Sequence, residues 1–332
     1  MGSEASVLLV VGGGRWGQVT LSVLARMQVP FDRVVVISKV NSDEVQLKID
    51  EIKAISSVPL ENIATLDEAL SKYIIGAAIV VNASALHFQT ASWLIKQGIH
   101  VLIEKPITQS LQQMQALIDY AKQNRVCIVP GLSYRFCSYL RNFSNEVDSR
   151  GEPSKFSIRW VDAINEIRYG QVKSHDVSIN VVQDVMPHIW TILSVVFKSE
   201  FIQVDQCWVD DKTGSQAVIY ATVGGIPGEI TLDRSGSSRQ RDVSVRFNTG
   251  SLMLDFSTEP GMVYAEEGAF SGDADWDKTL TPLAQQIEYF FAMILTSSSA
   301  EEDLHCCIES VACAERATTL GVSKTAAILR AT

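Results

Sequence analysis

Two residues in the second half of the chain have types and a spacing that suit proton transfer. Asp184 and His188 lie four residues apart in a stretch of helical pattern from Asn180 to Val196, so their side chains share one helix face. An imidazole titrates near neutral pH, as a general acid or base requires, and a neighbouring carboxylate orients it and favours its protonated form. Alone, such a pair is more often an ordinary surface pair, so its meaning depends on the features that follow.

An ionisable pair also ends a predicted strand in the first half of the chain. The apolar run from Val101 leads into Glu104, Lys105 and Pro106. Ligands of open parallel sheets bind beyond the carboxyl ends of the strands, where Lys105 is expected to lie. Pro106 restricts the backbone of the residue before it and therefore favours a fixed direction for the lysine side chain. An ammonium at such a position can stabilise negative charge that develops on a substrate oxygen.

A glycine-rich segment predicts a dinucleotide-binding loop. The sequence G-x-G-x-x-G occupies positions 12, 14 and 17, after a predicted strand at Ser6–Val11 and at the start of a predicted helix. In that context the first glycine allows a tight turn, the second lets the backbone approach a pyrophosphate, and the third lets the helix pack closely on the strand. The helix N-terminus adds amide donors and a partial positive charge. The residues expected around the phosphates are Gly12, Gly14, Arg15, Trp16 and Gly17.

The end of the second predicted strand favours one form of the cofactor. Where NAD-binding proteins place a carboxylate against the ribose 2′-hydroxyl, this chain has Ser38 and Lys39. A hydroxyl and an ammonium suit a 2′-phosphate, which a carboxylate would repel. We therefore expect NADP(H), with NAD as the alternative.

The arrangement of apolar residues predicts two domains. From residue 1 to 130, continuous apolar strands are each followed by a helix, which is typical of a parallel sheet buried on both faces. From 131 to 332, apolar and polar residues alternate, as in Phe156, Ile158 and Trp160, which indicates an open, mostly antiparallel sheet with helices on one face. The fold class is therefore α/β, with a doubly wound N-terminal sheet and a C-terminal α+β domain.

Composition excludes several classes of protein. The 332 residues suffice for about two domains, and the 46% hydrophobic and 20% charged residues are ordinary for a globular protein. A net charge of −10 argues against nucleic acid as a partner, and no apolar run is long enough for a membrane span. Glu4 precedes the first apolar segment, which argues against a secretory signal and favours the cytoplasm. Neither the five histidines nor the six cysteines show metal-ligand spacing, so we expect no metal and reduced structural thiols.

Several of these motifs together resemble the Gfo/Idh/MocA oxidoreductases, the family of glucose-fructose oxidoreductase and inositol dehydrogenase. The resemblance rests on the glycine motif, ALHFQTASWLIKQGIHVLIEKPIT at 85–108, YRF at 134–136, and D-x-x-x-H at 184–188. It implies a Rossmann domain followed by an open-faced α+β domain, a nicotinamide cofactor, and homodimers or homotetramers built on the open sheet.

The same resemblance assigns roles to individual residues. His188 would move the proton, with Asp184 beside it on the sugar or on the imidazole. His87 opens a helix and is expected either to cap it or to border the nicotinamide, and Arg135 either to bind substrate or to pin the domain junction. The residues expected at the cofactor, besides the glycine loop, Ser38 and Lys39, are Asn82, His87, Glu104 and Lys105, and those at the substrate are Lys105, Arg135, Asp184 and His188.

Three departures from the family pattern leave the substrate open. Asn82-Ala83-Ser84 stands where the family often has Thr-Pro-Asn, and Asn180-Val181-Val182-Gln183 replaces a Gly-Gly pair. Thr191 occupies a position where many members carry aspartate. The last two changes lie in the substrate-facing part of the chain.

The sequence therefore predicts an NADP(H)-dependent enzyme that interconverts a secondary alcohol and a ketone on a small molecule such as a sugar, cyclitol or related polyol. The altered segment 163–183 keeps a second interpretation open, a reductase of C=N or conjugated C=C bonds like relatives that act on imines and bilins. A third interpretation is a cofactor-binding sensor or assembly subunit without turnover.

Overall fold

The computed structural model describes residues 6–168, 171–172, 179–210, 212–296 and 301–331. The chain separates into two compact units. The first contains residues up to Gly131 together with Thr281–Ile308, and the second contains Leu132–Leu280 and the residues from Glu309 onward. In the described residues, none of the helices is both long enough and apolar enough to cross a lipid bilayer.

The first unit is built on a six-stranded parallel sheet. Its strand order is β3-β2-β1-β4-β5-β6, the doubly wound order in which strands β1 to β3 extend to one side of the sheet and β4 to β6 to the other. This confirms the predicted parallel sheet. The strands are β1 (Ser6–Val11), β2 (Arg33–Ile37), β3 (Leu60–Ile63), β4 (Ile74–Val80), β5 (His100–Glu104) and β6 (Ile128–Gly131).

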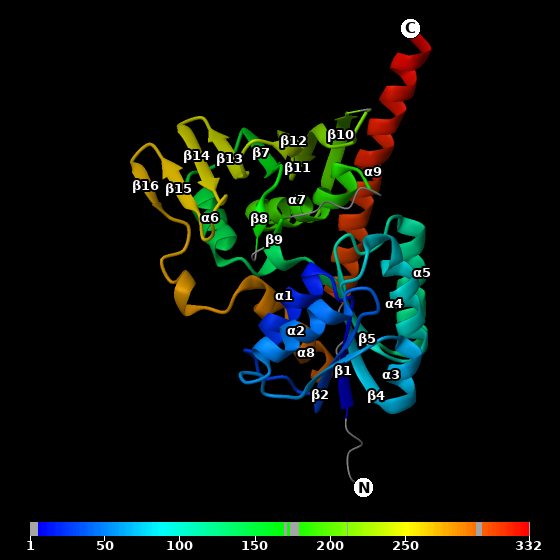
Figure 1. The fold of residues 1–332 in the computed structure, drawn as a ribbon. Coiled ribbons are helices and arrows are strands. Elements are labelled where there is room, and N and C mark those ends of the chain that lie inside the picture. Colours follow the sequence, from blue (N-terminus) through cyan, green and yellow to red (C-terminus); the bar gives the residue numbers. More distant parts are fainter. Residues whose placement is uncertain (1–5, 169–170, 173–178, 211, 297–300, 332) are drawn as a thin grey trace. The chain divides into compact units, whose positions relative to one another are not determined.

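Helices cover both faces of this sheet. α1, α2 and α8 lie on one face, and α4 and α5 lie on the other (Figure 1). The helical segments of this unit are α1 (Arg15–Leu24), α2 (Ser42–Ile52), α3 (Leu66–Lys72), η1 (Ser84–Leu86), α4 (His87–Lys96), α5 (Leu111–Asn124), α8 (Pro282–Thr296) and the start of α9 (Glu301–Ala331).

The first unit contains one segment that the predicted boundary at 131 placed in the second domain. Helix α8 buries Ile287, Phe290 and Phe291 in the same apolar cluster as Leu8 and Val10 of β1. An amphipathic helix joins whichever core buries its apolar stripe, and the local pattern does not say which core that is. The domain prediction of 131–332 is therefore corrected for residues 281–308.

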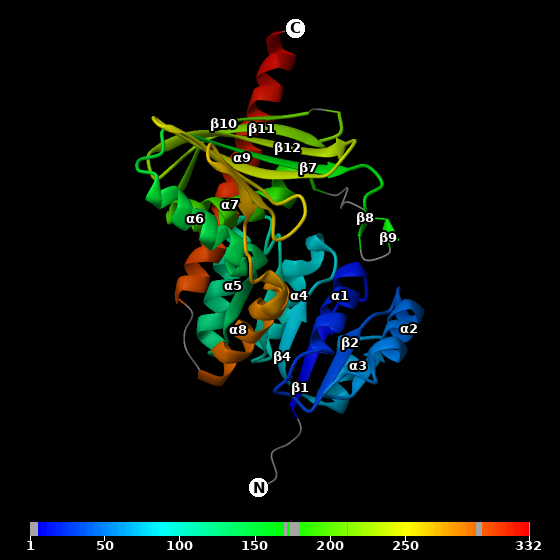
Figure 2. The same cartoon turned by 90° about the vertical axis from the view of Figure 1, so that its left-hand side faces the viewer.

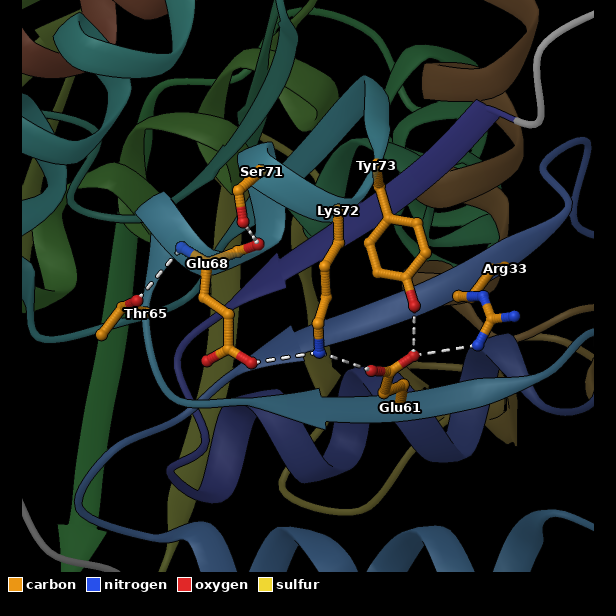
Figure 3. Close-up of polar contacts among 7 residues, drawn as sticks. All are labelled: Arg33, Glu61, Thr65, Glu68, Ser71, Lys72 and Tyr73. Carbon is orange, nitrogen blue, oxygen red and sulfur yellow. Dashed lines mark hydrogen bonds and ion pairs between the residues drawn. The ribbon is translucent and has the colours of Figure 1, made fainter.

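Two elements of the first unit, α2 and β3, were not predicted. Helix α2 buries only Val45, Ile49 and Ile52 among charged residues, and the edge strand β3 buries only Ile63. Weak apolar patterns of this kind give little signal in the sequence. On β3, Glu61 accepts hydrogen bonds from the Tyr73 hydroxyl at 2.6 Å and from Arg33 Nη1 at 2.9 Å (Figure 3). The charged group lies on an edge strand, where charge discourages pairing with another chain.

The second unit contains an eight-stranded sheet with helices α6 and α7 along one face (Figure 2). Only β12 and β7 pair in parallel; the other neighbouring strands described in this sheet are antiparallel, which confirms the predicted open sheet. Phe156, Ile158 and Trp160 alternate as buried residues of β7, as their pattern predicted.

The elements of this second unit carry the following bounds: η2 (Ser133–Phe136), α6 (Ser138–Ser149), β7 (Lys155–Ala163), β8 (Ile167–Arg168), β9 (Gln171–Val172), α7 (Val181–Phe197), β10 (Ile202–Val209), β11 (Gln216–Val223), β12 (Ile226–Gly236), β13 (Gln240–Phe247), β14 (Gly250–Asp255), β15 (Met262–Ala265), β16 (Gly268–Ser271) and η3 (Trp276–Lys278).

Candidate functional site

The glycine loop joins β1 to α1 and packs against the end of β4. Gly12 has a φ of +128°, and a Cβ on it would lie 2.7 Å from the backbone nitrogen of Asn82. A Cβ on Gly17 would lie 1.9 Å from the carbonyl oxygen of Gly12. Both positions therefore require glycine, the first for backbone conformation and close approach and the second for packing of the helix on the loop.

Gly14 differs from Gly12 and Gly17, because the fold itself leaves room for a side chain there. It is the N-cap residue of α1 without a side-chain cap, and a Cβ there would meet nothing within 4 Å. The first turn of α1 contains no acidic residue. The helix therefore presents its N-terminal amides to open space at the strand-reversal point of the sheet, which is the arrangement that binds a pyrophosphate. Arg15 and Trp16 follow directly, with the guanidinium Cζ 5.8 Å from the indole centroid.

At the end of β2, Ser38 packs against the glycine loop while Lys39 is exposed. Ser38 is 5% exposed, and its Oγ would lie 2.0 Å from a Cβ on Gly13. The loop that follows is held by Asn62, whose Nδ2 donates to Ser42 Oγ at 2.9 Å and to the Ser42 carbonyl at 3.1 Å. A hydroxyl and an exposed ammonium at the end of β2 are chemically suited to a 2′-phosphate.

The ends of β4 and β5 are joined through His87. Its Nδ1 lies 2.8 Å from the carbonyl oxygen of Pro106 and its Nε2 lies 3.0 Å from that of Asn82. The ring is buried, and the N-cap position of α4 belongs to Leu86 without a side-chain cap. The expectation that His87 caps its helix is therefore wrong, because both ring nitrogens face the backbone of the two strand ends. Asn82 in turn donates from Nδ2 to Thr90 Oγ1 at 2.9 Å.

Lys105 follows β5 at the corner where the sequence predicted it. The Lys105–Pro106 bond is cis, and both Glu104 and Lys105 are partly exposed. Gly131 of β6 runs close beside this corner, since a Cβ on it would lie 2.6 Å from Glu104 Cα. In the first unit, the glycine loop, Asn82 and Lys105 thus all lie at the carboxyl ends of the parallel strands.

In the second unit, α7 carries Asp184 and His188 on one partly exposed face, as the four-residue spacing predicted. The residues that replace the family's Gly-Gly pair form a capping box: Asn180 Oδ1 accepts from Gln183 N at 2.9 Å and Gln183 Oε1 accepts from Asn180 N at 3.1 Å. This departure fixes the start of the helix that carries the pair.

Thr191, the third departure, is fully buried. Its Oγ1 donates to the carbonyl oxygen of Pro187 at 2.7 Å. Segment 163–183 differs from the family pattern, and its residues 169–170 and 173–178 lie outside the described residues.

The imidazole of His188 packs against two aromatic rings. The indole of Trp160 stacks on it with centroids 5.1 Å apart, and the ring of Tyr134 meets it at an angle of 76° with centroids 5.1 Å apart. Burial raises the pKa of Tyr134, so its hydroxyl remains protonated at neutral pH. These contacts fix the plane of the imidazole.

A buried ion pair supports Trp160. The guanidinium Cζ of Arg241 lies 3.7 Å from the indole centroid, and Arg241 pairs with Asp162, both side chains being almost fully buried. Burial lowers the pKa of Arg241, and Asp162 opposes that shift. Sequence analysis missed Tyr134, Asp162 and Arg241 as neighbours of the site, because the register that pairs Arg241 with Trp160 across β13 and β7 is a tertiary property.

Arg135, the potential metal ligands and the cysteines remain to be placed. Arg135 is partly exposed at the end of η2, and its carbonyl oxygen accepts from Arg141 Nη1 at 3.2 Å. Within the described part of the chain, no group of three or more His, Cys, Asp or Glu side chains could hold a metal ion. Five of the six cysteines are buried.

Comparison with known proteins agrees with the fold. Residues 7–132 match the family described as "Oxidoreductase family, NAD-binding Rossmann fold", GFO_IDH_MocA. YceM of Salmonella typhimurium, named as an oxidoreductase, is 24% identical over 117 residues, and the uncharacterized oxidoreductase sll0816 of Synechocystis is 32% identical over 71 residues. These stretches cover 35% and 21% of this chain, and 35% and 19% of the lengths of those relatives.

Solved structures extend the likeness to nearly the whole chain. The UDP-N-acetylglucosamine 3-dehydrogenase GnnA of Acidithiobacillus ferrooxidans has a TM-score of 0.73 at 17% identity, covering 96% of this chain and 97% of that one. KijD10, a 3-ketoreductase of Actinomadura kijaniata in complex with TDP-benzene and NADP, has a TM-score of 0.76 at 14% identity, covering 95% and 97%. At these identities the likeness establishes the two-part fold. Residues 7–132 are thus the part of the chain that is similar to the Gfo/Idh/MocA oxidoreductases with their NAD-binding Rossmann fold.

Proposed function

We propose that this protein is an NADP(H)-dependent oxidoreductase that interconverts a secondary alcohol and a ketone on a sugar, a cyclitol or a related polyol derivative. The observation that carries the proposal is the open N-terminus of α1 behind Gly14, at the point of the sheet where the strand order reverses. The two structural relatives named above support it, since one is a nucleotide-sugar dehydrogenase and the other a ketoreductase solved with NADP.

The residues present fit the cofactor. The amides of α1 and the space above Gly14 would take the pyrophosphate, and Ser38 and Lys39 would take the 2′-phosphate. When bound, the nicotinamide supplies or accepts a hydride. Asn82 and Glu104 would flank the nicotinamide in this proposal, because Asn82 follows β4 against the glycine loop and Glu104 ends the neighbouring β5.

Two side chains would act on the substrate. His188 would take the hydroxyl proton in the oxidation direction and return it in reduction, and the Lys105 ammonium would stabilise negative charge that develops on a substrate oxygen. Asp184, one turn before His188, would hold the substrate or the imidazole. Arg135 would contribute a further contact to the substrate.

We also propose that the protein works in the cytoplasm as a homodimer or homotetramer built on the outer face of the eight-stranded sheet. In support, exposed aromatic residues lie at both ends of this sheet: Trp208 and Tyr220 on β10 and β11, and Tyr264 and Phe270 on β15 and β16. Neither nucleic acid nor a membrane is a partner in this proposal.

The proposal is tested first by cofactor binding and then by turnover. Calorimetry with the full chain should detect binding of NADPH, and a panel of polyols and nucleotide sugars should be screened for reduction of NADP⁺. Turnover with any secondary alcohol supports the proposal. Turnover only with imines or conjugated alkenes would replace it with the second interpretation, binding without any turnover would indicate a sensor, and absence of affinity for both coenzymes would contradict the proposal.

A further inference from the structure

His87 lies between two backbone carbonyl groups that belong to neighbouring strand ends. Its Nδ1 is 2.8 Å from the Pro106 oxygen, just beyond β5, and its Nε2 is 3.0 Å from the Asn82 oxygen, just beyond β4. Strands β4 and β5 are directly paired, with Val80 opposite Ile103. With only 1% of its surface exposed, the imidazole is held almost entirely by protein atoms.

Counting donors and acceptors limits the protonation state of this ring. A carbonyl oxygen only accepts hydrogen bonds, and a neutral imidazole has one N–H, so a neutral tautomer satisfies one contact and turns a nitrogen lone pair toward the other oxygen. The imidazolium has two N–H groups and satisfies both. Burial opposes the charge, whereas two carbonyl acceptors at hydrogen-bond distance favour it.

The charges of the surrounding elements also bear on His87. Strand β4 and η1 contain no titratable residue. The corner after β5 contributes one anion and one cation, Glu104 and Lys105. The remaining titratable groups on the elements packed against α4 are Lys96 at the far end of α4 itself, His100 at the start of β5, and Asp119, Tyr120 and Lys122 on α5. Arg15 begins α1, just after the glycine loop whose Gly12 packs on Asn82.

The contacts of His87 form a continuous path from the glycine loop to Lys105. Gly12 packs on the backbone of Asn82, the Asn82 carbonyl faces one nitrogen of His87, and the other nitrogen faces the carbonyl of Pro106, the residue after Lys105. Rotation of the Lys105–Pro106 corner would break this path at a buried position, where no water replaces the lost hydrogen bond.

We propose that His87 is a positioning residue which, as an imidazolium, ties the Lys105–Pro106 corner to Asn82 and thereby fixes Lys105 relative to the glycine loop. The part of this proposal that concerns catalysis rests on the proposed function of Lys105. The part that concerns the protonated ring is a property of the chain alone.

The protonated ring is tested on the unaltered protein. The full chain is labelled with ¹⁵N-histidine, and the His87 signals are assigned by their loss in His87→Gln. We expect both ring nitrogens of His87 to be protonated at neutral pH. A single neutral tautomer of His87 at neutral pH would overturn the proposal, whatever the protein's activity.

The positioning role is tested with two variants. His87→Leu removes both donors, whereas His87→Gln retains an amide NH₂ that can donate to a carbonyl. We expect His87→Leu to lower kcat by about tenfold to a hundredfold, as a misplaced catalytic group does, and His87→Gln to recover part of that loss. His100→Gln, a second histidine of the same unit, is the matched control and should keep the wild-type kcat.

The outcomes separate this proposal from the proposed function. An unchanged kcat in His87→Leu, or equal losses in the leucine and glutamine variants at equal folded fractions, would overturn the positioning role. A wild-type protein without turnover would contradict the proposed function, and the NMR result would still decide the state of His87.

Discussion

The imidazole of His188 stacks on the indole of Trp160, with ring centroids 5.1 Å apart and planes 20° from parallel. Trp160 belongs to the sheet and His188 to the helix that covers it, so this contact fixes the candidate proton-transfer group to the rigid part of its unit. Arg241, paired with Asp162, lies against the same indole. The orientation of His188 is therefore set by the sheet as well as by its own helix.

The stack predicts that Trp160 matters for turnover. Trp160→Leu should lower kcat by about tenfold to a hundredfold, because His188 loses the ring that fixes its plane. Trp160→Phe keeps an aromatic face and should lose less. NADPH affinity, measured by calorimetry, should stay unchanged in both, since Trp160 belongs to the second unit. Trp276→Leu, which changes a partly exposed tryptophan of η3 in the same unit, serves as the control; equal activity of Trp160→Leu and the control would contradict the prediction.

Loss of either proposed catalytic side chain should slow the chemical step. Lys105→Ala and His188→Ala should each lower kcat by about a hundredfold to ten-thousandfold, the range for removal of a general acid or base. Cofactor binding should remain nearly intact, because the phosphate cradle lies on the glycine loop. Steady-state kinetics with calorimetry of NADPH binding is the measurement. Normal turnover in both variants would remove the proposed mechanism.

Two glycines of the same loop should respond differently to alanine. At Gly17 a Cβ would lie 1.9 Å from a backbone oxygen, so Gly17→Ala should destabilise the fold by about 1–3 kcal/mol, as overpacking does. At Gly14 a Cβ meets nothing within 4 Å, so Gly14→Ala should fold normally and lose NADPH affinity because the methyl group enters the phosphate site. Thermal unfolding and calorimetry measure the two effects, and unchanged affinity in Gly14→Ala would count against the phosphate site.

The choice between the two coenzymes should depend on Lys39. In Lys39→Asp the new carboxylate repels a 2′-phosphate and can accept from a ribose 2′-hydroxyl, so the preference should move from NADP toward NAD. The ratio of the dissociation constants for NADPH and NADH is the measurement. Lys122→Asp makes the same change of charge on α5, and its ratio should match the wild type. An unaltered ratio in Lys39→Asp would show that Lys39 does not contact the phosphate.

The contacts of Glu61 on the edge strand β3 predict an effect of pH on stability. The Tyr73 hydrogen bond holds the pKa of Glu61 below its usual 4.5, with help from Arg33 and Lys72 and against partial burial. A lowered pKa in the folded state contributes stability that is present above the usual pKa and is lost as the pH falls through the folded value.

Glu61→Gln removes this titration. Between about pH 5 and pH 3 the free energy of unfolding should fall more in the wild type than in the variant, by a small amount because Glu61 is partly exposed. Chemical denaturation at each pH provides the measurement, with the exposed Glu51→Gln as control. If the free energy of unfolding of the wild type and of Glu61→Gln changed equally with pH, the role given to Glu61 would be contradicted.

Local patterns in the sequence were enough to predict the first sheet and its glycine loop. Continuous apolar strands, the spacing of Gly12, Gly14 and Gly17, and the position of Lys105 after a strand all depend on residues close together in the chain. The shared helix face of Asp184 and His188 is also local, since it follows from four-residue spacing. The weakly apolar α2 and β3 escaped because few of their residues are buried.

Tertiary structure decided what these residues touch. Trp160 and Arg241 lie 81 positions apart by number and meet only because β7 and β13 pair in one register, which also sets the ring beneath His188. The sequence leaves His87 either at a helix cap or at the nicotinamide, and the carbonyls that the two strand ends place at both of its nitrogens exclude the cap. Helix α8 joined the first core from far along the chain. Spacing determines the face on which a side chain lies, but its partners depend on strand register and helix docking, which are set by the packing of the whole unit.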